Sequence, residues 1–186
     1  MSSIGIDLGL KAVATCSNGD TLENSQIYRS AEIKLATAQR ANKSKRVRTI
    51  HAQIKNRRKD VLHKFSTAIT EKYGAIFVGN VSSEQLAKTK LAKSVLDAGW
   101  GMLKTQLEYK ANARSIEFKE VNERNTTQIC SCCGVISANS PKGRAGLRIR
   151  EWFCAECGTW HDRDINAAKN ILARGHSRLA VGIPTV

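Results

Sequence analysis

Two C-x-x-C pairs constrain this chain more than any other feature, and they are Cys130/Cys133 and Cys154/Cys157. Twenty residues separate the pairs, which is within the spacing typical of structural zinc sites. Four thiolates can close a tetrahedral shell around Zn²⁺, and each pair is followed directly by a glycine. We therefore expect a zinc ribbon over residues 126–161, inserted into a larger domain that comprises residues 1–125 and 162–186.

The charge of the chain indicates a polyanionic partner. Lys and Arg number 30 against 16 Asp and Glu, a formal net charge of +14, which favours nucleic acid. No apolar run is long enough to span a membrane, and the N-terminus lacks the pattern of a signal peptide. We therefore expect a cytoplasmic protein without membrane contact, in which paired cysteines more often bind metal than form disulfides.

The order of expected elements indicates an α/β domain with a mixed sheet flanked by helices. We expect strands at 3–9, 12–16, 21–22, 75–81 and 115–121, and helices over 30–72, 94–114 and 163–173. The first helical stretch should break into two helices around residues 41–44. Asp162 is the expected N-cap of the last helix, which should stop at Gly175.

The first strand carries an acid where acids are rare. Ile4, Ile6 and Leu8 fall on one face of the strand, whereas Asp7 falls on the other face between two glycines. The glycines would leave a bare surface that a metal or a phosphate backbone could approach. The alternative is an Asp at a strand end that faces water.

Asp164, at the start of the last helix, is the acid best placed to meet Asp7. Two-metal phosphodiester cleavage needs such carboxylates, because Mg²⁺ prefers oxygen ligands and bridges the attacking and leaving oxygens. An acid at a helix start can also serve only the helix dipole. Asp162 already suits that capping role, so we favour a metal-binding role for Asp164.

A run of basic residues in the second half of the first helical stretch favours phosphate contacts. The residues that we expect to bind nucleic acid are Arg46, Arg48, Lys55, Arg57 and Arg58. The alternative is an ordinary solvated helix face.

The chain resembles the C-terminal half of the TnpB (OrfB) family in the stretches GIDLG, DAGWGMLKTQLEYKA, TTQICSCCG, REWFCAECG and HDRDINAAKNIL. These proteins are transposon-encoded, RNA-guided DNA endonucleases with a RuvC-like, ribonuclease-H-type domain that a zinc ribbon interrupts. The resemblance implies Mg²⁺ at Asp7 and Asp164, structural Zn²⁺ at the four paired cysteines, and DNA and guide RNA as partners. Cys132 is then a bystander or a substitute ligand, and Cys16 is a buried thiol.

Two departures bear on activity. Gly79 stands where the resemblance implies a catalytic Glu at the end of the middle strand, and Asn80 offers only a neutral amide that points to the opposite face. Members of the family also commonly carry an N-terminal recognition half. Its absence here suggests a truncated product or one half of a split effector, with a second polypeptide supplying the missing lobe.

Three hypotheses remain open at this point. The chain is an Mg²⁺-dependent nuclease domain, a catalytically inactive nucleic-acid-binding module of the same fold, or, least favoured, a plain zinc-ribbon DNA binder. If the chain cleaves, another acid must replace the missing Glu. Glu151, just before the second cysteine pair, is preferred over Glu84, which follows the middle strand.

Overall fold

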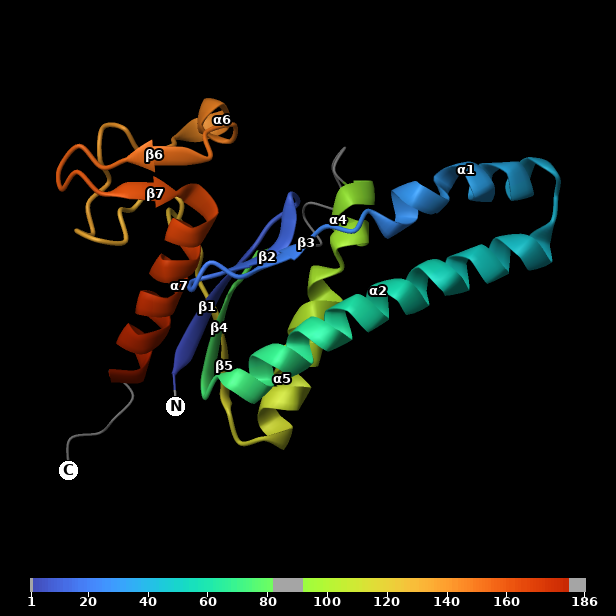
Figure 1. Ribbon diagram of the computed structural model, residues 1–186, viewed down its shortest axis with the longest axis horizontal. Coiled ribbons are helices and arrows are strands. Elements are labelled where there is room, and N and C mark those ends of the chain that lie inside the picture. The colour runs from blue at the N-terminus through green and yellow to red at the C-terminus, as the bar shows by residue number, and fades with distance from the viewer. Residues whose placement is uncertain (1, 82–91, 181–186) are drawn as a thin grey trace.

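A mixed sheet lies at the centre of the computed structural model, which describes residues 2–81 and 92–180 (Figure 1). Its five strands are β1 (Ser3–Leu8), β2 (Ala12–Cys16), β3 (Thr21–Glu23), β4 (Ala75–Gly79) and β5 (Glu117–Val121), in the order β3-β2-β1-β4-β5. β1 pairs with β2 antiparallel, whereas β1, β4 and β5 run parallel. The carboxyl ends of these three parallel strands therefore meet at one edge of the sheet, which is where α/β folds commonly place their ligands.

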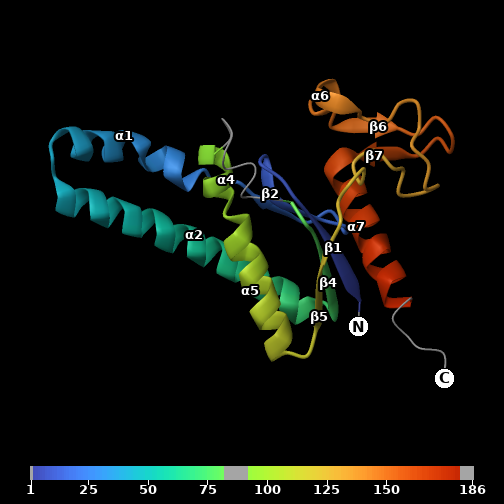
Figure 2. The same ribbon diagram turned by 180° about the vertical axis from the view of Figure 1, so that it is seen from behind.

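Helices cover both faces of the sheet (Figure 1, Figure 2). Helix α2 (Ser44–Lys72) and helix α5 (Trp100–Ala113) lie on one face, where Leu62, Leu103 and Leu107 pack on the aliphatic residues of β1 and β4. Helix α7 (Arg163–Ala180) lies on the other face. The predicted α/β class and mixed sheet are thus confirmed.

Glycines allow α7 to lie directly against the sheet. A β-carbon at Gly5 would collide with the carbonyl oxygen of Ala168, and one at Gly175 would collide with the ring of Phe77. Two expectations are therefore wrong. The surface at Gly5, expected to be bare, is covered by α7. Gly175 does not end α7, because this glycine lies within the helix where it packs closely against Phe77.

Helix α1 (Ile27–Arg40) and α2 form a long hairpin that extends away from the sheet (Figure 1). The expected break is confirmed, since residues 41–43 separate the two helices. A small satellite core of Leu35, Ala38, Ile50 and Ile54 joins them. The hairpin is therefore held by its own apolar seam and exposes most of its basic side chains.

The helix expected over residues 94–114 is two helices, α4 (Ala92–Ala98) and α5. Gly99 separates them with a left-handed φ of 67°, and a β-carbon there would lie 2.8 Å from Cδ of Arg58. Helical spacing in this stretch predicts five core-facing residues, of which Val95, Ala98, Leu103 and Leu107 are buried and Met102 is partly buried. Periodicity identified the buried face correctly but missed the glycine turn.

The ribbon lies at the N-terminal end of α7 (Figure 1). It contains a short helix, α6 (Gly143–Gly146), and a two-stranded hairpin of β6 (Glu151–Phe153) and β7 (Trp160–Asp162). β7 leads directly into α7, so the ribbon and the last helix are continuous in the chain. No helix in the described part of the chain has the length and apolar character needed to cross a membrane.

Candidate functional site

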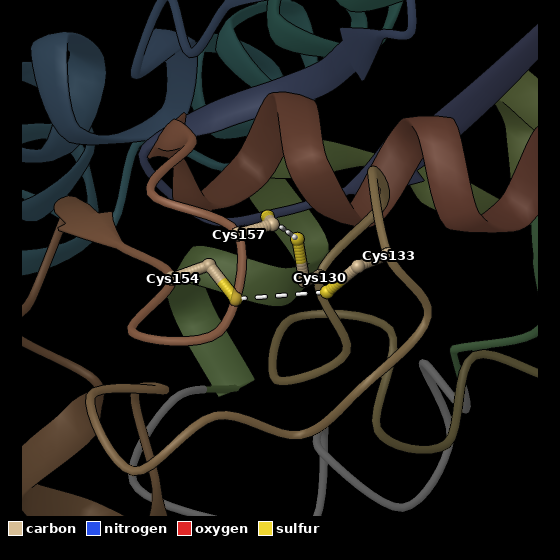
Figure 3. A group of neighbouring side chains, drawn as sticks. All are labelled: Cys130, Cys133, Cys154 and Cys157. Atoms are coloured by element: carbon tan, nitrogen blue, oxygen red, sulfur yellow. Dashed lines mark hydrogen bonds between the residues drawn. The ribbon is translucent and has the colours of Figure 1, made fainter.

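The four paired cysteines converge where the turn between β6 and β7 meets the loop that carries the first pair (Figure 3). The Sγ atoms of Cys130 and Cys157 are 3.6 Å apart, those of Cys133 and Cys154 are 3.7 Å apart, and all four lie within 4.8 Å of one another. A tetrahedral zinc site with Zn–S bonds of about 2.3 Å places its sulfurs roughly 3.8 Å apart. The cysteine side chains therefore fit a structural Zn²⁺ and are too far apart for disulfides.

The two halves of this metal site have the same backbone form. The N–H of Gly134 donates to the carbonyl of Cys130, and the N–H of Gly158 donates to the carbonyl of Cys154, each at 2.8 Å. Both glycines have left-handed φ values, 78° and 71°, which explains why glycine follows each pair. His161 lies beside the site, with Nε2 3.0 Å from Sγ of Cys130. Cys132 is exposed and Cys16 is buried.

Two asparagines tie the ribbon to α7. The side-chain amides of Asn166 and Asn170 both donate to the carbonyls of Thr126 and Ile129, at 2.7–3.2 Å. Oδ1 of Asn166 also accepts the N–H of Ser131, which lies inside the first cysteine pair. Because Asn166 is two residues from Asp164, these hydrogen bonds connect the zinc site to the first turns of α7, where Asp164 lies.

Asp7 and Asp164 come together at the edge where the parallel strands end. Asp162 caps α7 as expected, because its Oδ1 accepts the N–H groups of Asp164 and Ile165 at 2.9 and 2.8 Å. This cap places Asp164 in the first turn, beside the end of β1. Burial raises the pKa of the Asp7 carboxyl well above its ordinary value, and the Asp164 and Glu123 carboxylates raise this pKa further.

Glu123 occupies the space over Gly79. Parallel register puts Ile6 beside Val78 and Gly79 beside Val121, so Asp7 and Gly79 stand level on the α7 face of the sheet. Side chains alternate along a strand, and Glu123, two residues after Val121, shares this face. Its Oε2 lies 2.7 Å from the position of a β-carbon at Gly79. An acid that follows β5 therefore occupies the space over the backbone of Gly79.

The backbone of Glu123 is anchored by the residue beside Gly79. Oδ1 of Asn80 accepts the N–H of Glu123 at 3.2 Å, and the N–H of Asn80 donates to the carbonyl of Val121 at 2.9 Å. Burial raises the pKa of Glu123, and the charge of Lys104 opposes this rise. Asn80 thus contributes by holding the neighbouring chain segment and not by offering its amide to a metal.

The carboxylates are spread more widely than the sulfurs. Within the described residues, only the four cysteines bring three or more metal-binding atoms within 4.8 Å of one another. Like charges repel, and Oδ2 of Asp164 accepts a hydrogen bond from the Arg150 guanidinium at 2.9 Å. Asp7 on β1, Asp164 on α7 and Glu123 after β5 thus approach one edge of the sheet without forming a compact cluster.

The structure describes one of the two acids proposed from the sequence. Glu151 is exposed on β6, opposite Asp162 across the hairpin, and Glu84 lies outside the described residues. The sequence did not point to Glu123, because this residue is distant from both Gly79 and Asp164 along the chain. The sequence does contain a signal for this residue, because Glu123 closely follows the strand expected over residues 115–121. The carboxyl ends of neighbouring parallel strands meet at one edge of a sheet, so an acid there can reach the site.

The basic hairpin keeps four of its five expected phosphate-binding side chains exposed, and these are Arg46, Arg48, Lys55 and Arg57. Lys34, Arg46 and Arg57 also line a groove between α1 and α2. Arg58 differs, because its guanidinium pairs with the buried carboxylate of Asp97 at 3.3 Å. Asp97 in turn accepts the N–H of Tyr28 at 2.9 Å, so Arg58 is part of the joint between α1, α2 and α4.

Comparison with known proteins matches both parts of the chain. Residues 1–90 match the family OrfB_IS605, described as "Probable transposase", and residues 100–171 match the family described as "Cas12f1-like, TNB domain". A "Putative RNA-guided DNA endonuclease" of Streptomyces pristinaespiralis is 35% identical over 97% of this chain and 47% of its own length. The "Putative RNA-guided DNA endonuclease InsQ" of Escherichia coli (strain K12) is 29% identical over 97% of this chain and 51% of its own length.

Solved structures agree on the fold. In the cryo-EM structure of a "Cas12f1-sgRNA-target DNA complex", the protein superposes with a TM-score of 0.68 over 91% of this chain and 49% of its own, at 20% identity. The chain spans about half the length of the curated relatives that it matches. The matches account for the sheet and for the ribbon, and the chain belongs to the TnpB (OrfB) family.

Proposed function

We propose that this chain carries the metal-dependent, phosphodiester-cleaving part of an RNA-guided DNA endonuclease of the TnpB type. Its catalytic acids are Asp7, Asp164 and Glu123, and we propose Glu123 in place of the Glu151 suggested by the sequence. The observation that carries this proposal is the position of the Glu123 carboxylate over Gly79, beside the partly buried Asp7. A glycine with no acid nearby would argue that the activity is lost. A glycine that makes room for the carboxylate of Glu123 argues that the activity is retained.

Each residue of this site has a defined part. The three carboxylates would hold Mg²⁺, which when bound supplies an activated water and neutralises charge on the phosphate. Burial raises the pKa of Asp7 most, and the neighbouring Asp164 and Glu123 carboxylates raise this pKa further. Repulsion between these carboxylates would favour binding of a divalent cation. Arg150 pairs with Asp164 at 2.9 Å, and α7 holds Asp164 at the end of β1.

The proposal is tested by cleavage of single-stranded DNA in Mg²⁺ or Mn²⁺ by the wild type and by Asp7→Ala, Asp164→Ala, Glu123→Gln and Glu151→Gln. We expect the first three variants to lose cleavage and Glu151→Gln to keep it. Retained cleavage in Glu123→Gln together with loss in Glu151→Gln would reverse the assignment of the third acid.

The second candidate is a catalytically inactive module of the same fold that binds nucleic acid. The Gly79 substitution and the spread of the carboxylates favour it. Wild-type protein that binds DNA with any guide RNA supplied, yet cleaves nothing in either cation, would establish this candidate.

The partners follow from the same proposal. DNA and a guide RNA would contact the exposed basic face of the α1–α2 hairpin, through Arg46, Arg48, Lys55 and Arg57. A second polypeptide that supplies a recognition lobe stays a prediction. The division of the chain into a nuclease domain, residues 1–125 and 162–186, and a ribbon, residues 126–161, also stays a prediction. The hydrogen bonds of Asn166 and Asn170 would join these two parts.

A further inference from the structure

The outer face of the ribbon hairpin carries two exposed aromatic side chains. Phe153 of β6 and Trp160 of β7 are register partners, and their ring centroids are 5.6 Å apart. Trp160 is 72% exposed and Phe153 is 42% exposed. The alternate residues Trp152 and His161 point inward and are buried beside the zinc-site cysteines. The hairpin thus has one face committed to the ribbon core and one face with aromatic rings in solvent.

A purely structural role does not account for this pair. Cross-strand aromatic pairs stabilise a hairpin only modestly, and this hairpin is already fixed by the cysteine site at one end and by the inward-facing Trp152 and His161. Trp160 leaves most of its surface in water, so its contact with Phe153 buries little of it. A large exposed ring on a rigid element is typical of a binding surface.

The aromatic face continues into the carboxylate site. Trp160 and Asp162 lie two residues apart on β7 and therefore share one face, about 6.6 Å apart along the strand. Asp162 caps α7, and its carboxylate is close enough to Asp7 to raise the pKa of that group. A ligand lying on Trp160 would therefore extend toward Asp7 and Asp164.

The charges around the hairpin select the kind of ligand. Arg150 and Arg163 stand together where the hairpin meets α7, since the N–H of Arg163 donates to the carbonyl of Arg150 at 2.7 Å. Glu151 and Asp162 lie on the aromatic face itself and repel phosphates from it. Their carboxylates can accept hydrogen bonds from the amino groups of bases. These charges allow a strand to lie with its phosphates near Arg150 and Arg163 and its bases over the aromatic rings.

We propose that Trp160 and Phe153 form a stacking platform for unpaired bases of the strand that enters the carboxylate site. This proposal rests on the nucleic-acid partner of the proposed function but not on cleavage. Aromatic stacking tolerates any base, because every base has a π-face. The platform therefore selects single strands over duplexes without reading sequence.

The tryptophans of this chain make the test selective. Trp100 and Trp152 are buried, 2% and 4% exposed, so a change in tryptophan fluorescence on ligand addition reports mainly Trp160. Zinc-loaded full-length protein is titrated with single-stranded oligothymidylate and with a duplex of equal length, without Mg²⁺ or Mn²⁺. We expect the single strand to quench the fluorescence and the duplex not to do so.

Variants then separate stacking from folding. Trp160→Leu should lose the quench and weaken single-strand binding about 5- to 100-fold. Trp160→Phe should keep most of the affinity, and Val135→Ala, at another exposed apolar position of the ribbon, should bind as the wild type does. Zinc content and melting temperature of each variant show whether the ribbon is intact, and Phe153→Leu provides a second route if Trp160→Leu does not fold.

Three results would overturn the proposal. The first is unchanged single-strand affinity in Trp160→Leu with full zinc content. The second is equal quenching by duplex and single strand. The third is a shift from dimer to monomer in Trp160→Leu on size exclusion with oligonucleotide binding unchanged, which would assign the face to a second copy of the chain. Absence of cleavage activity in the wild type leaves each of these readouts intact.

Discussion

Oε2 of Glu123 lies 2.7 Å from the point where a β-carbon at Gly79 would stand. A side chain at residue 79 and the present position of the Glu123 carboxylate therefore exclude each other. The next nearest atom, Cδ1 of Ile171, is 3.2 Å from that point, so the main obstacle is the mobile end of one side chain. Gly79 thus provides no carboxylate of its own, and its lack of a side chain leaves room for the carboxylate of Glu123.

This relationship predicts the outcome of an exchange of acids. Gly79→Ala should fold normally but lower Mg²⁺-dependent cleavage, because the methyl group displaces the Glu123 carboxylate. Glu123→Gln should lower cleavage about 100-fold or more, the scale of losing one charge-stabilising group. Gly79→Glu combined with Glu123→Ala should recover activity that Gly79→Glu alone does not, as measured by single-turnover cleavage of a labelled strand.

The matched control for the exchange is Glu120→Gln. Glu120 lies on β5, three residues before Glu123, and pairs with Lys104 at 2.6 Å; its atoms are not among those nearest to Gly79. Its replacement should leave cleavage close to the wild-type rate. Equal losses in Glu120→Gln and Glu123→Gln would mean that the end of β5 matters for folding and that Glu123 has no special role.

Asp7 predicts a pH-dependent stability in protein without divalent cations. Its pKa in the folded chain is raised, so folding favours the protonated form. The contribution of Asp7 to the unfolding free energy should therefore be greatest near or below the ordinary pKa of about 4 and should fall as pH rises toward the raised value. Asp7→Asn removes this penalty and should melt several degrees higher than the wild type at pH 7.5 without Mg²⁺.

Added Mg²⁺ should reverse that order. A cation bound by Asp7 stabilises only the protein that retains the carboxylate, so the wild type should gain stability with Mg²⁺ concentration and Asp7→Asn should not. Thermal melts at several Mg²⁺ concentrations measure both effects. An Asp7→Asn variant that melts lower than the wild type without cation would contradict the assignment of a desolvated carboxylate beside like charges.

The sequence predicted the parts of this structure that depend on local pattern. Strand alternation around Asp7, the cap at Asp162, the break after Arg40 and the zinc spacing are each encoded within a few residues. What it missed depends on contacts between distant segments. Gly175 continues a helix because Phe77 lies against it, and Glu123 reaches Gly79 because β4 and β5 are adjacent and in register.

The zinc site predicts a local dependence of structure on metal. We expect about one Zn²⁺ per chain, and Cys154→Ser should unfold the ribbon while the sheet stays folded, because so small a unit has little apolar core of its own. Hydrogen exchange should show reduced protection in residues 126–161 and at the start of α7, which shares the Asn166 contact with Ser131. Metal analysis and a cobalt-substituted absorption spectrum report the ligand set.

The control for the zinc prediction is Cys132→Ser. Cys132 lies between two ligands but is exposed and outside the four-sulfur cluster, so its replacement should leave metal content unchanged. Protein purified without chelator that contains no zinc would contradict the site. A Cys132→Ser variant that loses zinc would mean that this thiol exchanges with a neighbour.

The basic hairpin predicts two different effects from arginines on one helix. Replacing Arg46, Arg48, Lys55 and Arg57 with Ala should weaken nucleic-acid binding and reduce the slope of log affinity against log salt, by up to about 0.7–0.9 for each phosphate that the variant no longer neutralises. Arg58→Ala should leave that slope nearly unchanged, because its guanidinium faces Asp97 and not solvent. Fluorescence anisotropy with a labelled oligonucleotide at several salt concentrations measures both.

Arg58→Ala should instead destabilise the fold. Asp97 is buried, and its Oδ2 has no hydrogen-bond partner among the residues that the structure describes. Within that part of the chain, removal of Arg58 would leave the carboxylate with the N–H of Tyr28 as its partner. Breaking a buried ion pair in this way costs up to about 3 kcal/mol, so the melting temperature should drop by several degrees. The fourfold variant removes only exposed charges and should melt near the wild type. An Arg58→Ala protein with unchanged stability and a reduced salt slope would return this residue to the phosphate-binding face that its sequence context predicts.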